Sequence, residues 1–288
     1  MNTDFLKQFG AELDAQNDQP IGQPTSRRAA LGQSGKLGLG AAAMAVPFIG
    51  MAREVHAAKT GGMFNNRYHG VLDFALTLEY LEYFFYKQAV ESGDIPSDAL
   101  PLFRDIRDHE LAHVNLLKAA VQGTDNPATV YEQDDFDYTL GGMFDPFGSG
   151  NYESQLLVIA QGFEDTGVRA YKGQAVNLKN DTAPDALDIL TVALQIHSVE
   201  ARHAAAIRTL RGETPYISLN ENPAAAIAPA YAGEDVTTQA GINLTTLGSG
   251  YSANNAAQAF DEPLTREAVL AIAGPFITGE GDPQTGDP

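Results

Sequence analysis

RDHELAHVNLL, residues Arg107–Leu117, reads as part of a helix whose apolar stripe carries two polar side chains. At helical spacing this stripe contains Phe103, Ile106, Glu110, His113 and Leu117. A buried carboxylate costs free energy unless a partner compensates its charge, and a metal ion is one such partner. The stretch therefore predicts that Glu110 and His113 belong to a site inside a helical core.

The second half of the chain repeats this arrangement. Glu200 and His203 form a second Glu-x-x-His, on a helical segment near residue 200. The apolar segment before each pair also carries a glutamate near its middle, Glu79 in the first half and Glu164 in the second. The repetition indicates two helical hairpins of similar design.

Hydrophobic patterning predicts an all-α fold. Four long segments have helical periodicity, at about residues 67–91, 98–121, 152–178 and 184–211. The connections inside each pair are short, which favours antiparallel hairpins, whereas residues 123–150 form a long crossover rich in Gly, Pro and Asp. Two hairpins joined by one long crossover predict a four-helix bundle.

We divide the chain into an export signal (1–57), the bundle (58–212) and an irregular C-terminal extension (213–288). The extension contains one predicted short helix, EPLTREAVLAIAG, which begins at Pro263 or Thr265 and ends at Gly274. Its last residues, GEGDPQTGDP, are expected to be disordered.

Each helix of the predicted bundle carries an acidic residue near its middle. A centre of two metal ions bridged by carboxylates needs one Glu from each of two helices and a Glu-x-x-His from each of the other two. The i, i+3 spacing places both side chains of a pair on one helical face, where they reach the same ion. The predicted metal ligands are Glu79, Glu110, His113, Glu164, Glu200 and His203. Two iron or two manganese ions suit these ligands, and the sequence does not choose between the metals.

Neighbouring residues leave alternatives open. Glu82 shares a helical face with Glu79 and is the alternative ligand from the first helix. His197 lies one turn before the second Glu-x-x-His, where a supporting or core role is favoured over ligation. Asp165 is expected to support the site from outside or to lie at the surface, and His109 is expected to be structural.

The order of these residues resembles the ferritin-like superfamily, and within it the branch that includes desiccation-related proteins. The similarity covers about residues 60–212, and the tail DEPLTREAVLAIAGPFI also resembles that branch. The resemblance implies a ferritin-like four-helix bundle. It also implies that Glu110 and Glu200 bridge the ions and that His113 and His203 are terminal ligands.

The resemblance further implies a tyrosine beside the metals. Tyr86 lies seven residues after Glu79, and Tyr171 lies seven residues after Glu164. Tyr86 and Tyr171 are therefore the candidate catalytic residues, with ordinary core packing as the alternative.

The N-terminal residues predict export by a twin-arginine-type signal to the periplasm or beyond. A polar segment leads to Arg27-Arg28, then to the apolar run LGLGAAAMAVPFIGM, and Val55-His56-Ala57 offers a cleavage site. The apolar run is short and is interrupted by Pro47, so we expect no stable membrane insertion after processing.

Composition limits the possible partners. The net charge of −19 argues against a nucleic-acid surface, and the absence of cysteine excludes thiolate metal sites and cysteine nucleophiles.

The first helix is apolar nearly all round, which predicts cover by another chain or by the tail, and a homodimer is the expected assembly.

Two functions lead at this point, and a metal store or chaperone, which exchangeable metal without turnover would favour, is a third. The first is a dimetal protein that reacts with oxygen or peroxide, either oxidising ferrous iron or removing peroxide. The second is a non-catalytic structural or metal-binding protein of stress or desiccation on the same bundle, since a fold does not decide chemistry. Turnover that depends on oxygen or peroxide distinguishes the two.

Overall fold

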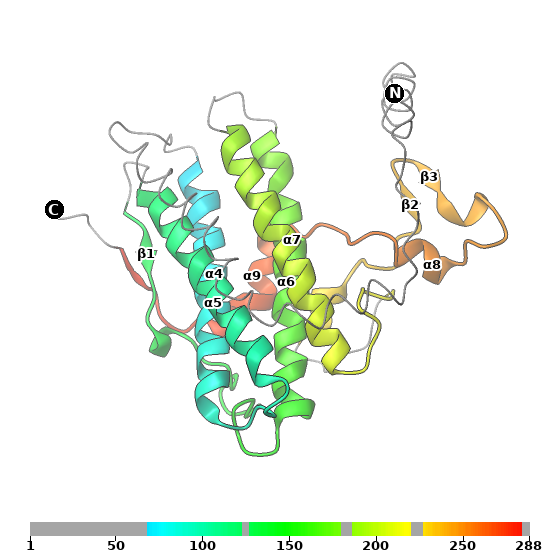
Figure 1. Cartoon of the computed structure of the whole chain (residues 1–288). Coiled ribbons are helices and arrows are strands. Elements are labelled where there is room, and N and C mark those ends of the chain that lie inside the picture. The colour runs from blue at the N-terminus through cyan, green and yellow to red at the C-terminus, as the bar shows by residue number, and fades with distance from the viewer. Residues whose placement is uncertain (1–67, 123–126, 180–185, 220–226, 284–288) are drawn as a thin grey trace, which may run out of the picture. The chain divides into compact units, whose positions relative to one another are not determined.

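The long apolar segments of the chain form four long α-helices (Figure 1). A computed structural model describes residues 68–122, 127–179, 186–219 and 227–283. The four helices are α4 (His69–Ser92), α5 (Leu100–Gln122), α6 (Leu157–Lys179) and α7 (Ala186–Leu210). Each lies where the sequence predicts it, and a π-helical turn, η3 (Tyr152–Leu156), precedes α6. The predicted export signal lies outside the described residues.

The helices pack as two hairpins. Helix α4 packs along α5, and α6 packs along α7, while α4 also contacts α6 across the interface between the hairpins (Figure 1). This arrangement confirms the predicted all-α four-helix bundle. It also directs the apolar stripes of all four helices toward one interior, where the predicted ligands lie.

The crossover covers the outer face of α4 with aromatic rings. The ring of Phe85 packs against those of Tyr138 and Phe147, with centroids 5.3 and 5.5 Å apart. The Tyr138 hydroxyl donates a hydrogen bond of 2.6 Å to the carbonyl oxygen of Leu81. The second apolar face of this helix is thus covered mainly by its own chain, so it gives no reason for a dimer, and the homodimer stays a prediction.

The C-terminal extension contains more regular structure than the one short helix expected. The predicted helix is α9 (Arg266–Ala273), and Thr265 caps it by accepting a 3.2 Å hydrogen bond from the Ala268 N–H. A second short helix, α8 (Ala253–Ala257), and a hairpin of β2 (Thr238–Gln239) with β3 (Ile242–Asn243) precede it. The extension also contains the short helical turns η4 (Ala228–Tyr231), η5 (Leu244–Thr246) and η6 (Gly274–Phe276), and the crossover contains η2 (Gln133–Asp135).

Residues 279–283 contact the crossover, contrary to the expectation of disorder there, while residues 284–288 of that prediction lie outside the described part of the chain. Strand β4 (Asp282–Pro283) is antiparallel to β1 (Thr129–Val130). The N–H groups of Thr278 and Gly279 donate to the Asp135 carbonyl oxygen at 2.8 and 3.0 Å. These are backbone contacts between distant segments, so composition does not reveal them.

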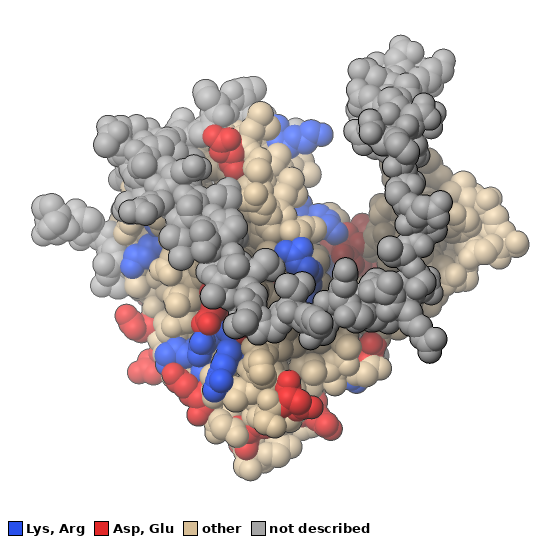
Figure 2. Space-filling model, viewed as in Figure 1, with Lys and Arg blue, Asp and Glu red and all other residues tan. Residues whose placement is uncertain are grey.

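None of the described helices has the length and apolar character needed to cross a membrane. On the face drawn in Figure 2, Lys and Arg side chains lie among Asp and Glu side chains. The net charge of −19 is therefore not gathered into a single acidic patch on this face.

Candidate metal centre

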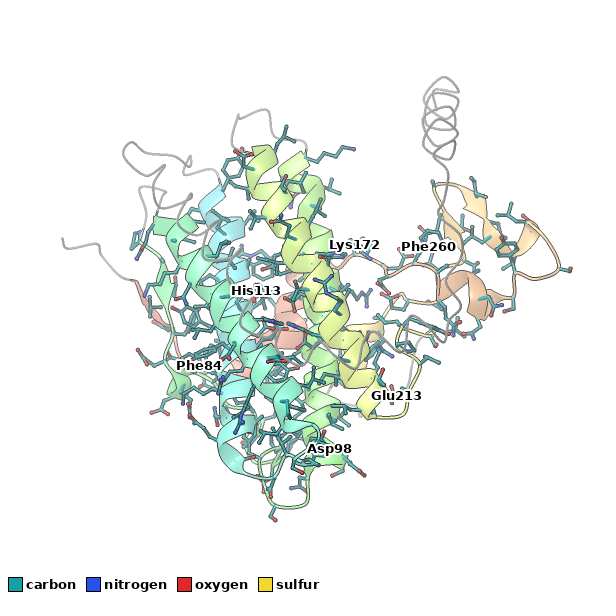
Figure 3. The ribbon with its side chains drawn as sticks, viewed as in Figure 1. Phe84, Asp98, His113, Lys172, Glu213 and Phe260 are labelled. Atoms are coloured by element: carbon teal, nitrogen blue, oxygen red, sulfur yellow. The ribbon has the colours of Figure 1, made fainter. Side chains whose placement is uncertain are left out.

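The six predicted ligands meet in the interior of the bundle. Glu79 comes from α4, Glu164 comes from α6, and α5 and α7 each supply one Glu-x-x-His pair. None of the six side chains is more than 5% exposed. Figure 3 shows His113 pointing from α5 into the space between the hairpins.

The six residues form two groups that can each hold one metal ion. One group contains Glu79, Glu110, His113 and Glu200, and the other contains Glu110, Glu164, Glu200 and His203. Within each group, one ligand atom per residue lies within 4.8 Å of the others. Glu110 and Glu200 belong to both groups, so they are placed to bridge two ions.

Distances around the two histidines show the same pattern in each hairpin. His113 Nδ1 lies 3.0 Å from Glu79 Oε2, 3.0 Å from Glu110 Oε2 and 3.2 Å from Glu200 Oε1. His203 Nδ1 lies 2.9 Å from Glu110 Oε1, 3.3 Å from Glu164 Oε2 and 3.9 Å from Glu200 Oε2. Each imidazole therefore faces three carboxylates, one of them from its partner helix in the hairpin.

Several potential metal-ligand atoms at this centre form no hydrogen bond of good geometry among the described residues, although His203 Nδ1 and Glu110 Oε1 lie 2.9 Å apart. They are Glu110 Oε1, Glu164 Oε2, both carboxylate oxygens of Glu200, and His203 Nδ1. Buried polar atoms are nearly always satisfied, and clustered carboxylates repel one another. A set of converging oxygen and nitrogen donors in this condition fits divalent metal ions.

The two tyrosines link the hairpins. The Tyr86 hydroxyl, on α4, donates a hydrogen bond of 2.5 Å to Glu164 Oε1 on α6. The Tyr171 hydroxyl, on α6, donates to Glu79 Oε1 on α4. Each tyrosine thus holds one oxygen of the other hairpin's glutamate and leaves the second oxygen facing a histidine.

Burial and mutual repulsion shift the protonation of the carboxylates. Burial raises the pKa of Glu79 to about 7, against the opposing effect of His113. Burial and the charge of Glu110 raise the pKa of Glu200 well above its usual range. Glu110 differs, because His113 and His203 outweigh its burial and hold its pKa well below the usual range. Without metal, the centre therefore retains protons on some of its carboxylates near neutral pH.

The histidines are pushed toward the charged form. Burial alone would lower the pKa of His113, but the charges of Glu79 and Glu110 raise it well above the usual range. The charges of Glu164 and Glu110 have the same effect on His203. Protons on these groups partly offset the carboxylate charge that metal ions would otherwise balance.

Glu82, the alternative ligand, is buried beside the centre but belongs to neither group. A Cβ atom on Gly167 would lie 3.3 Å from Glu82 Oε1 and 3.4 Å from Glu200 Oε2. The missing side chain of Gly167 thus leaves room for these two carboxylates. Of the two candidate ligands on α4, only Glu79 belongs to one of the two groups.

Asp165 and His197 lie outside both groups. Asp165 is buried, accepting hydrogen bonds from Arg208 Nη2 at 2.6 Å and from the Tyr231 hydroxyl at 2.7 Å. The surface alternative for Asp165 was therefore wrong, because a cation from α7 and the extension cover it. His197 is half-buried, and burial together with the charge of Lys172 lowers its pKa.

His109 has a role that sequence reasoning missed. Its Nδ1 lies 2.9 Å from His203 Nε2, and the two rings are stacked with centroids 5.2 Å apart. A partner on the second nitrogen of a ligating histidine fixes the orientation of its ring. The available signal was the i, i+4 spacing of His109 and His113, which places both rings on one side of α5.

Comparison with known proteins agrees with this architecture. The ferritin-like domain family matches residues 68–213, just over half of the chain. No match is found among curated proteins or among solved structures. The finer assignment to the desiccation-related branch stays a prediction. The matched residues include the whole four-helix bundle and the buried carboxylate and imidazole groups that could hold metal. The chain therefore belongs to the ferritin-like domain family.

Proposed function

We propose that this protein holds two iron or two manganese ions between its hairpins and uses them in redox chemistry with oxygen or peroxide. The observation that carries the proposal is the pair of buried groups that share Glu110 and Glu200. In the proposal Glu79 and His113 hold one ion, Glu164 and His203 hold the other, and the shared glutamates bridge them. The four carboxylates match the charge of two divalent cations.

When bound, such ions supply electron transfer to or from oxygen or peroxide. The protein's own residues prepare the place where this happens. The four helices exclude water from the centre, and Tyr86 and Tyr171 orient Glu164 and Glu79 by hydrogen bonds. These hydroxyls also hold protons directly against the ligands, which supports the expectation of a catalytic role.

Metal content tests the proposal directly. We expect about two iron or manganese ions per mature chain purified from the native host. A Glu110→Ala/Glu200→Ala variant is expected to lose both ions, whereas Glu91→Ala, an exposed glutamate of α4, is the matched control and should keep them. A native protein that is stably folded and free of metal would refute the proposal and favour the structural role.

Turnover tests the redox part separately. The metal-loaded protein is mixed with peroxide, or its ferrous form with oxygen, and consumption of the oxidant is measured. We expect consumption by the wild type and by Glu91→Ala, and none above free metal by the double variant. Two bound ions without any consumption would assign the protein to metal storage or to a structural role.

We also propose export through the twin-arginine route, supported by Arg27-Arg28 and the apolar run that follows. An Arg27→Lys/Arg28→Lys variant is expected to remain inside the cell as an unprocessed precursor. Secretion of that variant at the wild-type level would contradict this route.

A further inference from the structure

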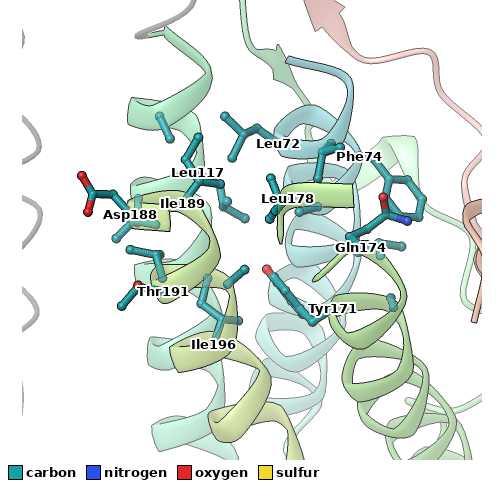
Figure 4. A pocket seen from close by; sticks show the side chains of 18 residues that line it. Leu72, Phe74, Leu117, Tyr171, Gln174, Leu178, Asp188, Ile189, Thr191 and Ile196 are labelled. Carbon is teal, nitrogen blue, oxygen red and sulfur yellow. The ribbon is translucent and has the colours of Figure 1, made fainter. Parts of the chain in front are cut away.

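A second feature of the bundle lies beyond the metal centre. A cavity of about 340 Å³ lies between all four helices, toward the ends formed by the start of α4 and α7 and the close of α5 and α6 (Figure 4). Its wall is mostly apolar, with side chains that include Leu72, Leu117, Leu178 and Ile189. Small-molecule sites have volumes of about 300–1,000 Å³ and apolar walls, so this cavity has the size of one.

The lining of the cavity extends along the bundle. Its lining on α7 runs from Asp188 to Ile196, which corresponds to about 12 Å at 1.5 Å per residue. On α4 it extends from Val71 to Leu78. An apolar lining that follows α7 for about two turns leaves room for an aliphatic chain oriented along the bundle.

Polar groups occur at few places in the lining. They belong to Tyr171, Gln174, Asp188 and Thr191. Asp188 and Thr191 are exposed, and none of the described lining residues is Lys, Arg or His. An anionic head group would thus meet no cation and would approach a carboxylate, which disfavours a fatty-acid anion.

One wall of the cavity is in contact with the metal centre. Tyr171 lines the cavity, and its hydroxyl donates a hydrogen bond to Glu79. Figure 4 shows the Tyr171 side chain among the apolar side chains with its hydroxyl turned into the interior. A molecule in the cavity would therefore lie one side chain away from a predicted metal ligand.

We propose that the cavity binds one uncharged, unbranched aliphatic molecule, oriented along the bundle with one end against Tyr171. An apolar occupant restores the contacts that the lining side chains lack across an empty cavity. Its position beside a metal pair rests on the proposed function, whereas the binding itself depends only on the cavity.

Calorimetric titration with 1-decanol and with decanoate tests the proposal. The mature protein is used as purified and again after treatment with a chelator. We expect one decanol per chain in both preparations, and decanoate to bind at least about tenfold more weakly.

Variants locate the binding site. Ala193→Phe, on α7, and Ala75→Leu, on α4, fill the cavity from opposite sides and are expected to weaken decanol binding by about tenfold or more. Ala201→Phe is the matched control, because Ala201 is an exposed residue of α7 outside the cavity, and it should bind within about twofold of the wild type. Circular dichroism and thermal unfolding confirm that each variant folds.

Three results would overturn the proposal: no decanol binding by the folded wild type, equal binding of decanoate, or unchanged binding in both filled variants. A change of oligomeric state in Ala193→Phe, without decanol binding by the wild type, would assign the cavity to a second copy of the chain. Decanol binding by a protein that takes up no metal would refute the proposed function and leave this inference standing. Two bound metal ions without decanol binding would do the reverse.

Discussion

The two hairpins have the same inner face and different outer faces. Inside, each contributes a glutamate, a tyrosine seven residues later and a Glu-x-x-His, and each tyrosine bonds to the other hairpin's glutamate. Outside, Phe85 of the first hairpin is covered by the aromatic rings of Tyr138 and Phe147 from the crossover. The second is covered by the C-terminal extension, which it meets through the buried ion pair of Arg169 with Glu234.

Arg169 is the centre of that second cover. It is 1% exposed, and its Nε lies 2.7 Å from Glu234 Oε1, while its other nitrogens donate to backbone carbonyls that include Ala232 at 2.8 Å. A Cβ on Gly173 would lie 1.9 Å from the Leu264 carbonyl oxygen, so only glycine allows the extension to approach α6 this closely. The comparison teaches that ligand chemistry constrains the inner faces equally, whereas each outer face depends on the segment that covers it.

The largest expected effect tests the likeness of the inner faces. Since His113 and His203 each belong to one group, His113→Ala and His203→Ala should each lose about one of two ions per chain. Metal analysis of the two purified variants measures this. Loss of both ions from only one variant would break the symmetry and point to a special role for the His109 contact.

The aromatic cover of the first hairpin should be important for stability. Phe85→Ala is expected to lower the free energy of unfolding by about 3–5 kcal/mol, because it removes a fully buried ring and leaves a cavity. Phe260→Ala is the matched control, since this ring is 43% exposed, and should cost less than about 0.5 kcal/mol. Equal losses from both, measured by denaturant unfolding, would contradict this account.

The ionic cover of the second hairpin should behave differently. Arg169→Met leaves Glu234 buried without its cation and is expected to cost about 3–5 kcal/mol. Arg169→Met/Glu234→Leu should recover much of that loss, because no buried charge is left unpaired. Lys87→Met, which breaks the surface pair with Glu91, should cost less than about 1 kcal/mol. A double variant as unstable as the single one would show that the arginine acts through its packing and its hydrogen bonds to backbone carbonyls, and not through the ion pair.

The pH dependence of stability should report mainly on the titratable groups of the inner faces. Glu79 titrates near 4.5 when unfolded and near 7 when folded, so between these values the folded state holds a proton that the unfolded state has lost. The metal-free protein should therefore lose stability as the pH rises from about 5 to about 8, by up to about 3 kcal/mol for this group. The raised pKa values of His113 and His203 act in the same direction.

Metal loading should show the opposite trend, since ions displace these protons and bind more tightly as the pH rises. Thermal unfolding with and without metal at several pH values measures both trends. A metal-free protein that gains stability with rising pH in this range would contradict the assignment.

The smallest expected effect compares the two tyrosines. Tyr86→Phe and Tyr171→Phe each remove one hydrogen bond to a glutamate and should each cost about 1 kcal/mol in the metal-free protein. Equal losses of stability would support the equivalence of the two hydrogen bonds, in which each hairpin's tyrosine donates to the other hairpin's glutamate. A much larger loss for Tyr171→Phe would indicate that its place in the cavity wall matters as well.

Prediction succeeded where local spacing carries the information. The helices followed from apolar periodicity, and the six members of the two groups followed from polar residues that interrupt it at matching places. It was less successful where distant segments meet. The pairing of β1 with β4, the burial of Asp165 under Arg208 and the contact of His109 with His203 all join residues far apart in the chain.

The sequence by itself determined which residues face the interior, because a helix repeats its faces at 3.6 residues per turn and a charged residue on an apolar face needs a partner. Only the tertiary structure decided how the two repeats meet: which oxygen of each glutamate a tyrosine holds, which carboxylates are shared, and where a cavity remains beside them. Those outcomes depend on the packing of two hairpins and their covers in three dimensions, which local spacing does not specify.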